Sequence, residues 1–263
     1  MNAKLKSFAV KWILMLGRCG VNPKTLVESV CGVPRYIRDF RRFRAGYSGS
    51  MRFQPCLIDW YKPNGDTQTE YFWQDLLVAQ MIFRASPQKH VDVGSRVEGF
   101  ISSVASFREI EVLDIRSMSS NIPNVTFKQA DMMDENGIQG EICDSLSCLH
   151  ALEHFGLGRY GDPIDQGGAE RGFRNMARLL KPEGTFYLSV PIGRPCVEFN
   201  ANRIFDPHAI MDWADRSHFK ISKLIIISPY GSPQELPCDA STLSKLSTDR
   251  YNLGLFVFRK AAM

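Results

Sequence analysis

One short stretch of this chain collects most of the side chains that could do acid–base chemistry. Between Leu149 and Asp165 the sequence places two of the five histidines, three acids and an arginine. Either His150 or His154 could act as a general base toward a substrate hydroxyl, because an unperturbed imidazole exchanges its proton near neutral pH. This stretch is therefore the first candidate for a catalytic site.

Three further interpretations apply to the same residues. A divalent ion such as magnesium or manganese could be held by His150, Glu153 and His154, with His208 as a fourth ligand. The letters H-x-x-E-H also match the inverted zinc-protease motif, but that motif requires a continuous helix and two glycines follow at once. The protease is therefore disfavoured. An architectural role for His154, packed against a sheet, is the remaining alternative.

A second pattern could hold a nucleoside. Residues 90–100 read as a buried strand, a turn at Gly94 and a helix, and the next apolar run ends at Asp114. In Rossmann-type sheets the glycine lets the backbone approach the ligand, and the acid accepts hydrogen bonds from ribose hydroxyls. Gly99 also falls at a fingerprint position, but Arg96 stands where the backbone must approach a pyrophosphate. A nucleoside cofactor without phosphate therefore fits better than a dinucleotide.

The elements that must position these residues alternate between strands and helices. Beyond the first two strands, the sequence predicts strands near 125–131, 141–149, 185–190, 221–228 and 253–259, and a helix over 170–180. This alternation predicts an α/β fold with a Rossmann-like, doubly wound, mostly parallel sheet of seven strands. Ligands bind at the carboxyl ends of such strands, where both patterns fall.

The order of these segments resembles class I S-adenosylmethionine-dependent methyltransferases, notably in the helix-Lys181-Pro182-Glu183-Gly184-strand passage. The usual D-x-G-x-G-x-G loop of that family is reduced here to D-x-G. The resemblance implies that S-adenosylmethionine is bound by Asp92, Gly94, Ser95, Arg96, Gly99, Asp114 and Asp131. Asp92 would orient the methionine ammonium group, Asp114 the ribose and Asp131 the adenine. Some members chelate a sugar diol through a metal at an E-x-x-E-H cluster, where this chain has H-x-x-E-H.

Four segments, 33–40, 92–96, 145–150 and 153–165, resemble a bacterial family known only as a domain of unknown function with a methyltransferase-like core. Its members are often linked with surface-polysaccharide genes. The resemblance implies O-methylation of a sugar or glycan acceptor, which could be lipid-linked, in surface polysaccharide biosynthesis. The acceptor would then contact Arg159, Tyr160, Asp162 and Asp165.

Two functions of other classes stay open. One is a non-catalytic adaptor that keeps the fold and joins a glycan-assembly complex through its N-terminal region. The other is a nucleotide-sugar epimerase or dehydrogenase, which would usually carry a Tyr-x-x-x-Lys pair. No tyrosine of the chain begins such a pair. The second alternative is therefore weaker than the first.

Charge divides the chain at the start of the predicted sheet. Residues 1–85 carry 13 lysines and arginines against 6 acids, whereas residues 86–263 carry 19 against 22. We therefore expect a basic N-terminal helical extension over 1–85 and a methyltransferase-like Rossmann domain over 86–263. In the extension, one helix face holds Ile37, Phe40 and Arg44, and the other largely holds Arg38, Arg41 and Arg42. This helix could bind an anionic membrane or a lipid-linked phosphate, or it could dock on the sheet with its charged face in solvent. No nucleic-acid-binding signature occurs.

Cysteine usage and the N-terminal sequence indicate a compartment. The seven cysteines form no C-x-x-C pair, as expected in a reducing environment. The apolar run 8–16 is too short to span a bilayer and precedes no small-x-small cleavage site, so it reads as an amphipathic helix. We expect a cytoplasmic protein, peripheral to the inner face of the membrane if the basic segment binds lipid.

Overall fold

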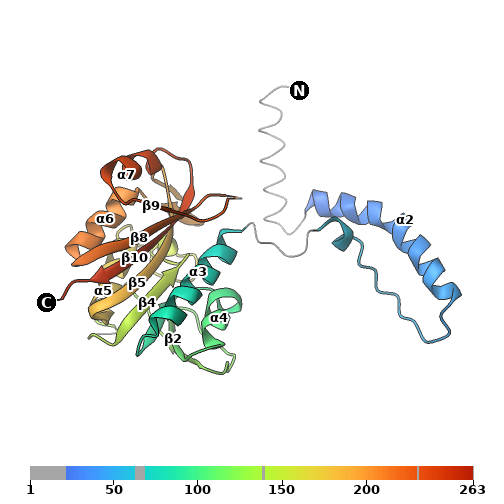
Figure 1. Cartoon of the computed structure of the whole chain (residues 1–263), viewed down its shortest axis with the longest axis horizontal. Coiled ribbons are helices and arrows are strands. Elements are labelled where there is room, and N and C mark those ends of the chain that lie inside the picture. Colours follow the sequence, from blue (N-terminus) through green and yellow to red (C-terminus); the bar gives the residue numbers. More distant parts are fainter. Residues whose placement is uncertain (1–21, 63–68, 138–139, 230, 263) are drawn as a thin grey trace. The chain divides into compact units, whose positions relative to one another are not determined.

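The structure is a computed structural model that describes residues 22–62, 69–137, 140–229 and 231–262 (Figure 1). The chain divides into two units, residues 1–66 and 67–263. The predicted amphipathic helix over 8–16 lies outside the described residues. Within the described ranges, no helix is both long and apolar enough to cross a membrane.

An eight-stranded sheet forms the centre of the second unit, in the order β3-β2-β1-β4-β5-β10-β8-β9. Its strands are β1 (His90–Val93), β2 (Ile110–Asp114), β3 (Val125–Gln129), β4 (Cys143–Leu149), β5 (Leu180–Ile192), β8 (Phe219–Ile227), β9 (Gln234–Leu236) and β10 (Asn252–Lys260). The first five are mutually parallel, and β10 runs antiparallel to both of its neighbours. The predicted Rossmann-like, mostly parallel sheet is confirmed.

The sheet has one strand more than the sequence predicted. The additional strand, β9, has three residues and pairs antiparallel with β8 at the edge of the sheet. Prolines stand immediately before and after it, which is why the segment reads as a loop in the sequence. A separate hairpin of β6 (Cys196–Glu198) and β7 (Asn202–Ile204) follows β5.

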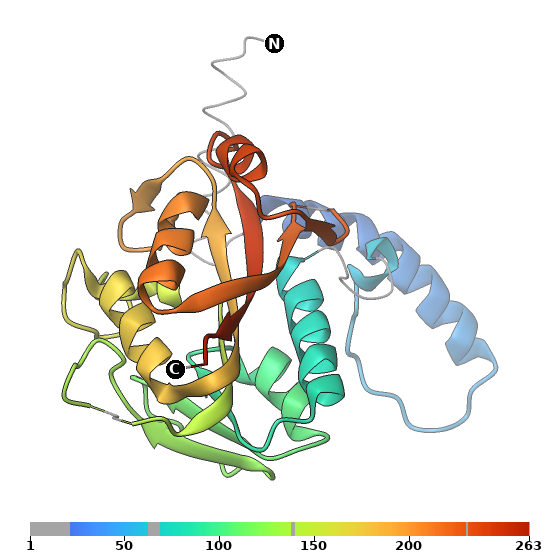
Figure 2. The same ribbon diagram turned by 60° about the vertical axis from the view of Figure 1, so that its left-hand side comes forward.

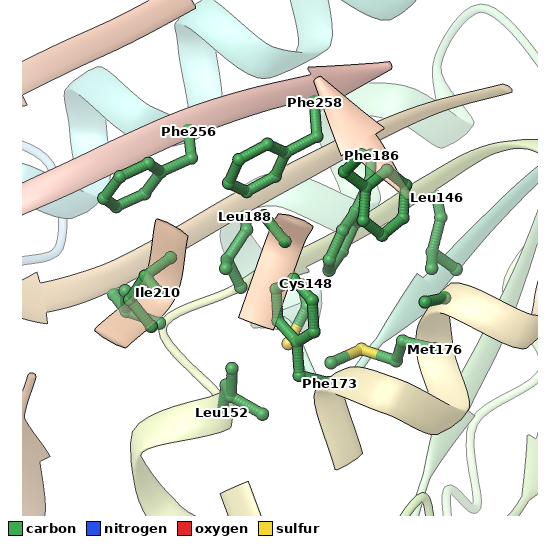
Figure 3. Packing of buried hydrophobic residues seen from close by; sticks show 14 of the residues in the cluster. Leu146, Cys148, Leu152, Phe173, Met176, Phe186, Leu188, Ile210, Phe256 and Phe258 are labelled. Atoms are coloured by element: carbon green, nitrogen blue, oxygen red, sulfur yellow. The ribbon is translucent and has the colours of Figure 1, made fainter. Parts of the chain in front are cut away.

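Helices cover both faces of the sheet (Figure 2). On one face lie α5 (Gly168–Leu179), α6 (Pro207–Arg216) and α7 (Ala240–Leu246), and on the other lie α3 (Glu70–Ala85) and α4 (Ser102–Ala105). Because side chains alternate along a strand, Phe256 and Phe258 of β10 face Phe173 and Met176 of α5, whereas Leu255 faces α3 (Figure 3). The two resulting cores hold the strand ends in place.

Helix α3 belongs to the second unit, although the sequence placed it in the N-terminal extension. Thr69 caps its first turn by accepting a hydrogen bond from the Phe72 backbone N–H. Val78 and Ile82 are fully buried in the core on that face of the sheet. The structural boundary therefore falls after residue 66 and not after residue 85, because a helix that precedes the first strand completes the core.

The described part of the first unit contains one long helix, α2 (Pro23–Ala45), and a single helical turn at Asp59–Tyr61. The Asn22 side chain caps α2 by accepting hydrogen bonds from the backbone N–H groups of Lys24 and Thr25. Gly32 is its only buried residue, because the backbone carbonyl of Leu57 lies against it. The helical character expected for the extension is thus present in α2.

Candidate functional site

A cavity of about 310 Å³ opens at the carboxyl ends of β1, β2 and β4. Most of the polar residues singled out in the sequence line it: Gly94, Arg96, Asp114, Asp131, His150, His154, Arg159, Tyr160 and Asp162. Ser95, Gly99, Asp165 and His208 do not line it, and neither do Asp92 and Glu153, which are buried beside it. The two sequence patterns therefore meet at one site.

Gly94 forms the turn between β1 and the following helix. Its φ of +70° lies in the left-handed region, and its N–H donates to the Leu113 carbonyl at 2.9 Å. A Cβ at this position would lie 3.0 Å from the Ala151 side chain. Glycine is thus required both by the backbone angle and by the space at the cavity wall.

Asp92 is completely buried and does not reach the cavity. Its carboxylate accepts hydrogen bonds from the Ser95 N–H and hydroxyl, at 3.0 and 2.6 Å, and from the Ser147 hydroxyl at 2.5 Å. Burial raises the pKa of Asp92 to about 7, although these hydrogen bonds lower it. Asp92 therefore ties β1, the loop and β4 together, and this geometry does not support the predicted contact with an ammonium group.

Asp114 lies at the cavity wall, where a ribose-binding acid is expected, but its carboxylate is already bound by Arg116. The Arg116 guanidinium donates to both carboxylate oxygens, at 3.0 and 2.6 Å, and its backbone N–H donates to Oδ1 at 2.8 Å. The same guanidinium lies 4.4 Å from the centre of the Tyr160 ring. A ribose can bind Asp114 only if this arginine releases or shares the carboxylate.

Asp131 follows the neighbouring strand β3 and lines the cavity beside Asp114. The two segments are joined by a hydrogen bond from the Ala130 N–H to the Asp114 carbonyl, at 3.0 Å. Oδ1 of Asp131 accepts the Met133 N–H at 2.8 Å. Ala130, Met132 and Met133 add an apolar wall, so this part of the cavity combines one carboxylate with a surface suited to a flat base.

His150 lies between two carboxylates, which favour its protonated form. Its Nδ1 lies 2.7 Å from Glu153, its Nε2 lies 3.2 Å from Glu70, and its ring stacks on Tyr71 at 4.5 Å. Burial lowers the pKa of His150, but the two carboxylates outweigh this effect and raise the pKa to about 9. Tyr251 in turn donates to Glu70 at 2.7 Å. A protonated imidazole accepts no proton, so the geometry does not support His150 as the general base at neutral pH.

His154 has surroundings that favour its neutral imidazole. Its Nδ1 lies 2.7 Å from the Ala201 carbonyl, which assigns the ring proton to Nδ1 and leaves Nε2 as an acceptor. Burial lowers the pKa of His154, although Glu153, 3.6 Å from Nε2, raises it. The Arg159 guanidinium donates to the same carbonyl at 2.8 Å. Of the two histidines, His154 is the one that can accept a proton at neutral pH.

The expected metal site finds no support in the geometry. Among the described residues, no three histidine, cysteine or acidic side chains are arranged to hold a metal ion. His208 lies on α6, with its Nε2 3.4 Å from the Ser244 hydroxyl. Glu153 is almost fully buried, and its Oε1 is engaged by His150. Within the described residues, Oε2 of Glu153 has no hydrogen-bond partner. Glu70, His150 and Glu153 therefore form an ionic network around the imidazole and not a set of metal ligands.

The segment from Gly156 to Asp165 is organised mainly by its own acids. Asp162 accepts hydrogen bonds from the backbone N–H groups of Gly156, Gly158 and Tyr160, at 2.7 to 3.1 Å. Burial raises the pKa of Asp162, but these hydrogen bonds bring it below its usual range. Asp165 accepts the Gly167 N–H and lies 3.2 Å from Arg171, outside the cavity. Both acids shape the loop, and Arg159, Tyr160 and Asp162 of this segment line the cavity.

Four residues of the site escaped the sequence analysis: Glu70, Tyr71, Arg116 and Tyr251. Glu70 and Tyr71 lie on a helix that was assigned to the extension, and Tyr251 precedes the last strand, so no motif marks any of the three. Arg116 could have been found, because an arginine two residues after a strand-end acid is well placed to cover it.

A family model described as Caenorhabditis protein of unknown function, DUF268, matches residues 96–212. The match spans less than half of the chain and includes Asp114, both site histidines and the loop to Asp165. Its description gives no activity, and it mentions neither a bacterial source nor polysaccharide. No curated protein matched the chain.

Solved structures of class I methyltransferase type resemble the chain at low sequence identity. The cyclase SpnF matches with a TM-score of 0.50 and 14% identity, over 72% of this chain and 81% of that one. YcgJ from Bacillus subtilis matches at 0.49 and 13% identity, over 72% and 99%. A Burkholderia thailandensis didemethyltoxoflavin N-methyltransferase with bound S-adenosylhomocysteine matches at 0.48 and 14% identity, over 75% and 82%. The first of these is named a cyclase, so the shared fold does not determine the reaction. The chain has the Rossmann-like fold of class I methyltransferases.

Proposed function

We propose that the chain is an S-adenosylmethionine-dependent methyltransferase whose cofactor lies in the cavity at the ends of β1, β2 and β4. One observation carries the proposal. Two acids, Asp114 and Asp131, follow adjacent parallel strands and line a single cavity beside the left-handed turn at Gly94. A nucleoside needs this combination of close backbone, ribose acceptor and adenine pocket.

The residues of the chain would divide the work of binding. Gly94 lets the backbone approach the ligand, Asp114 accepts the ribose hydroxyls once Arg116 turns away, and Asp131 meets the adenine amino group. Asp92 does not contact the ligand in this proposal; it holds the turn at Ser95 against β4 through hydrogen bonds. Bound S-adenosylmethionine supplies a methyl group on a positively charged sulfur.

For the acceptor we propose a hydroxyl group of a sugar or glycan. Arg159, Tyr160 and His154 add a polar and aromatic wall to the same cavity. His154 Nε2 takes the hydroxyl proton as the oxygen–carbon bond forms and the sulfur–carbon bond breaks. Glu153, 3.6 Å from that nitrogen, stabilises the resulting imidazolium. The sugar itself rests on the family resemblance of the sequence, and the polar wall is compatible with it.

Calorimetric titration of the whole chain with S-adenosylhomocysteine tests the proposal, with NAD and a nucleotide-sugar titrated in parallel. We expect saturable binding of S-adenosylhomocysteine alone, and weaker binding in Asp114→Asn. The matched control is Glu109→Gln, because Glu109 is exposed and lies outside the cavity. Absence of binding, or binding of NAD or the nucleotide-sugar in its place, contradicts the proposal.

A second candidate is a non-catalytic adaptor with this fold. One observation favours it: Asp92 and Asp114, the acids expected to meet the cofactor, are both satisfied by neighbouring side chains. Cofactor binding without turnover of any glycan hydroxyl would support the adaptor. Methyl transfer that is lost in His154→Gln would support the enzyme.

A further inference from the structure

Helix α2 exposes an apolar stripe. Leu26, Val30, Val33 and Ile37 follow one another at spacings of four, three and four residues, so they share one face of the helix. Their exposed fractions are 63%, 64%, 40% and 41%. Side chains of this kind are normally buried, and a continuous stripe of them marks a surface that binds something.

The rest of the described first unit offers these side chains no core. Between residues 22 and 62, Gly32 is the only buried residue. Several large aromatic side chains are also exposed, among them Phe43, Phe53 and Trp60 at 61%, 71% and 73%. A segment of this length without a core gains little apolar burial by folding alone.

Positive charge accompanies the apolar stripe. Residues 22–62 contain eight lysines and arginines and three acids. Within this range, Glu28 pairs with Lys24 and Asp39 pairs with Arg38. Arg35 lies over the Trp60 ring at 4.5 Å. Within residues 22–62, no ion pair joins Arg41, Arg42 or Arg44 to an acid, so this part of the chain leaves three guanidinium groups at the C-terminal end of the helix for an anionic surface.

We propose that α2 binds an anionic membrane surface in the plane of the interface. Its apolar stripe would enter the boundary between headgroups and acyl chains, and its arginines would contact the phosphates. The exposed Trp60 has the amphipathic ring that favours this depth, and Phe43 and Phe53 add apolar surface. A protein partner or a second copy of the chain would also accept the stripe, but neither explains the unpaired arginines as directly as a negatively charged surface does.

Vesicle flotation of the whole chain tests this proposal, with phosphatidylcholine vesicles that either contain or lack phosphatidylglycerol. We expect flotation only with the anionic vesicles, and less of it as the salt concentration rises. Arg41→Gln together with Arg42→Gln should weaken partitioning about 30-fold. Leu26→Ser together with Val30→Ser should abolish it.

The matched control for charge is Lys220→Gln together with Lys245→Gln, because both lysines are exposed and lie in the second unit. This variant should float like the parent. Equal flotation of every variant, or no flotation with anionic vesicles, overturns the proposal. A dimer in light scattering without lipid that Leu26→Ser with Val30→Ser converts to monomer also overturns it, in favour of a second copy as the occupant.

Discussion

Arginines in the two units of the chain have opposite surroundings. In the second unit Arg116 is held by Asp114, Arg96 by Glu98, and the buried Arg203 donates to the Phe155 carbonyl. In the first unit Arg41 and Arg42 extend from a helix whose large apolar side chains are themselves exposed. The second unit pairs these charges and builds two apolar cores, whereas residues 22–62 of the first unit build no core and expose the apolar stripe of α2. This difference separates a domain with its own apolar cores from a segment that has none.

The largest expected effect contrasts the two units directly. Phe173 is fully buried between α5 and the sheet, so Phe173→Ala should lower the free energy of unfolding by about 3–5 kcal/mol. Ile37 on α2 is partly exposed, so Ile37→Ala should cost less than about 0.5 kcal/mol. Urea denaturation measures both. Similar losses in the two variants would show that α2 is part of the cooperative core.

The ionic network around His150 should make stability depend on pH. Because the folded-state pKa is about 9 and the ordinary value is 6.5, the imidazolium stabilises the fold fully below about pH 6.5. That contribution is lost as the pH rises through about 9. We therefore expect His150→Asn, which tolerates the left-handed backbone at this position, to cost about 2–3 kcal/mol in mild acid.

Urea denaturation of the parent and His150→Asn from mild acid to alkaline pH measures this effect. The groups that face the His150 imidazole are Glu70, Glu153 and Tyr71, and Tyr251 donates a hydrogen bond to Glu70. The gap between parent and variant should narrow toward high pH. A gap that stays constant with pH would mean that the ring contributes by packing and not by charge.

Substitution of Gly94 separates two roles of this turn, backbone conformation and ligand binding at the cavity wall. Gly94→Ala should destabilise the fold by about 1–2 kcal/mol and weaken S-adenosylhomocysteine binding, because the new methyl group lies at the cavity wall. Gly140→Ala is the matched control: its φ is also positive, but no atom lies near its Cβ position. Thermal denaturation and calorimetry on both variants separate strain from blocked binding. Equal ligand affinity in the two would remove Gly94 from the binding site.

Arg116 gives the smallest expected effect. Because it covers Asp114, Arg116→Ala should raise the affinity for S-adenosylhomocysteine about fivefold, the value of a half-exposed ion pair of about 1 kcal/mol. Arg174→Ala, which breaks a surface pair with Glu135, is the control and should leave affinity unchanged. A weaker affinity in Arg116→Ala would show that this arginine contacts the ligand.

Much of the second unit could be predicted from the sequence, because buried parallel strands leave continuous apolar runs and their order suffices to fix the fold class. The location of the site could be predicted too, since acids at strand ends converge at one sheet edge. The roles of individual residues could not. The role of Asp92 depends on Ser147, and the role of His150 depends on Glu70. Each partner comes from a segment far away in the sequence. A spacing pattern contains no information on such partners.

The strand order also has a consequence for self-association. Both ends of the sheet are short strands, five residues in β3 and three in β9, so each offers few unpaired backbone groups to another chain. At the start of β8, which β9 does not cover, the exposed Lys220 lies on the edge strand, and the exposed Lys128 lies on the edge strand β3. A charged side chain on an edge strand opposes the addition of a further strand. The sheet is thus protected against growth into intermolecular β-structure at both of its margins.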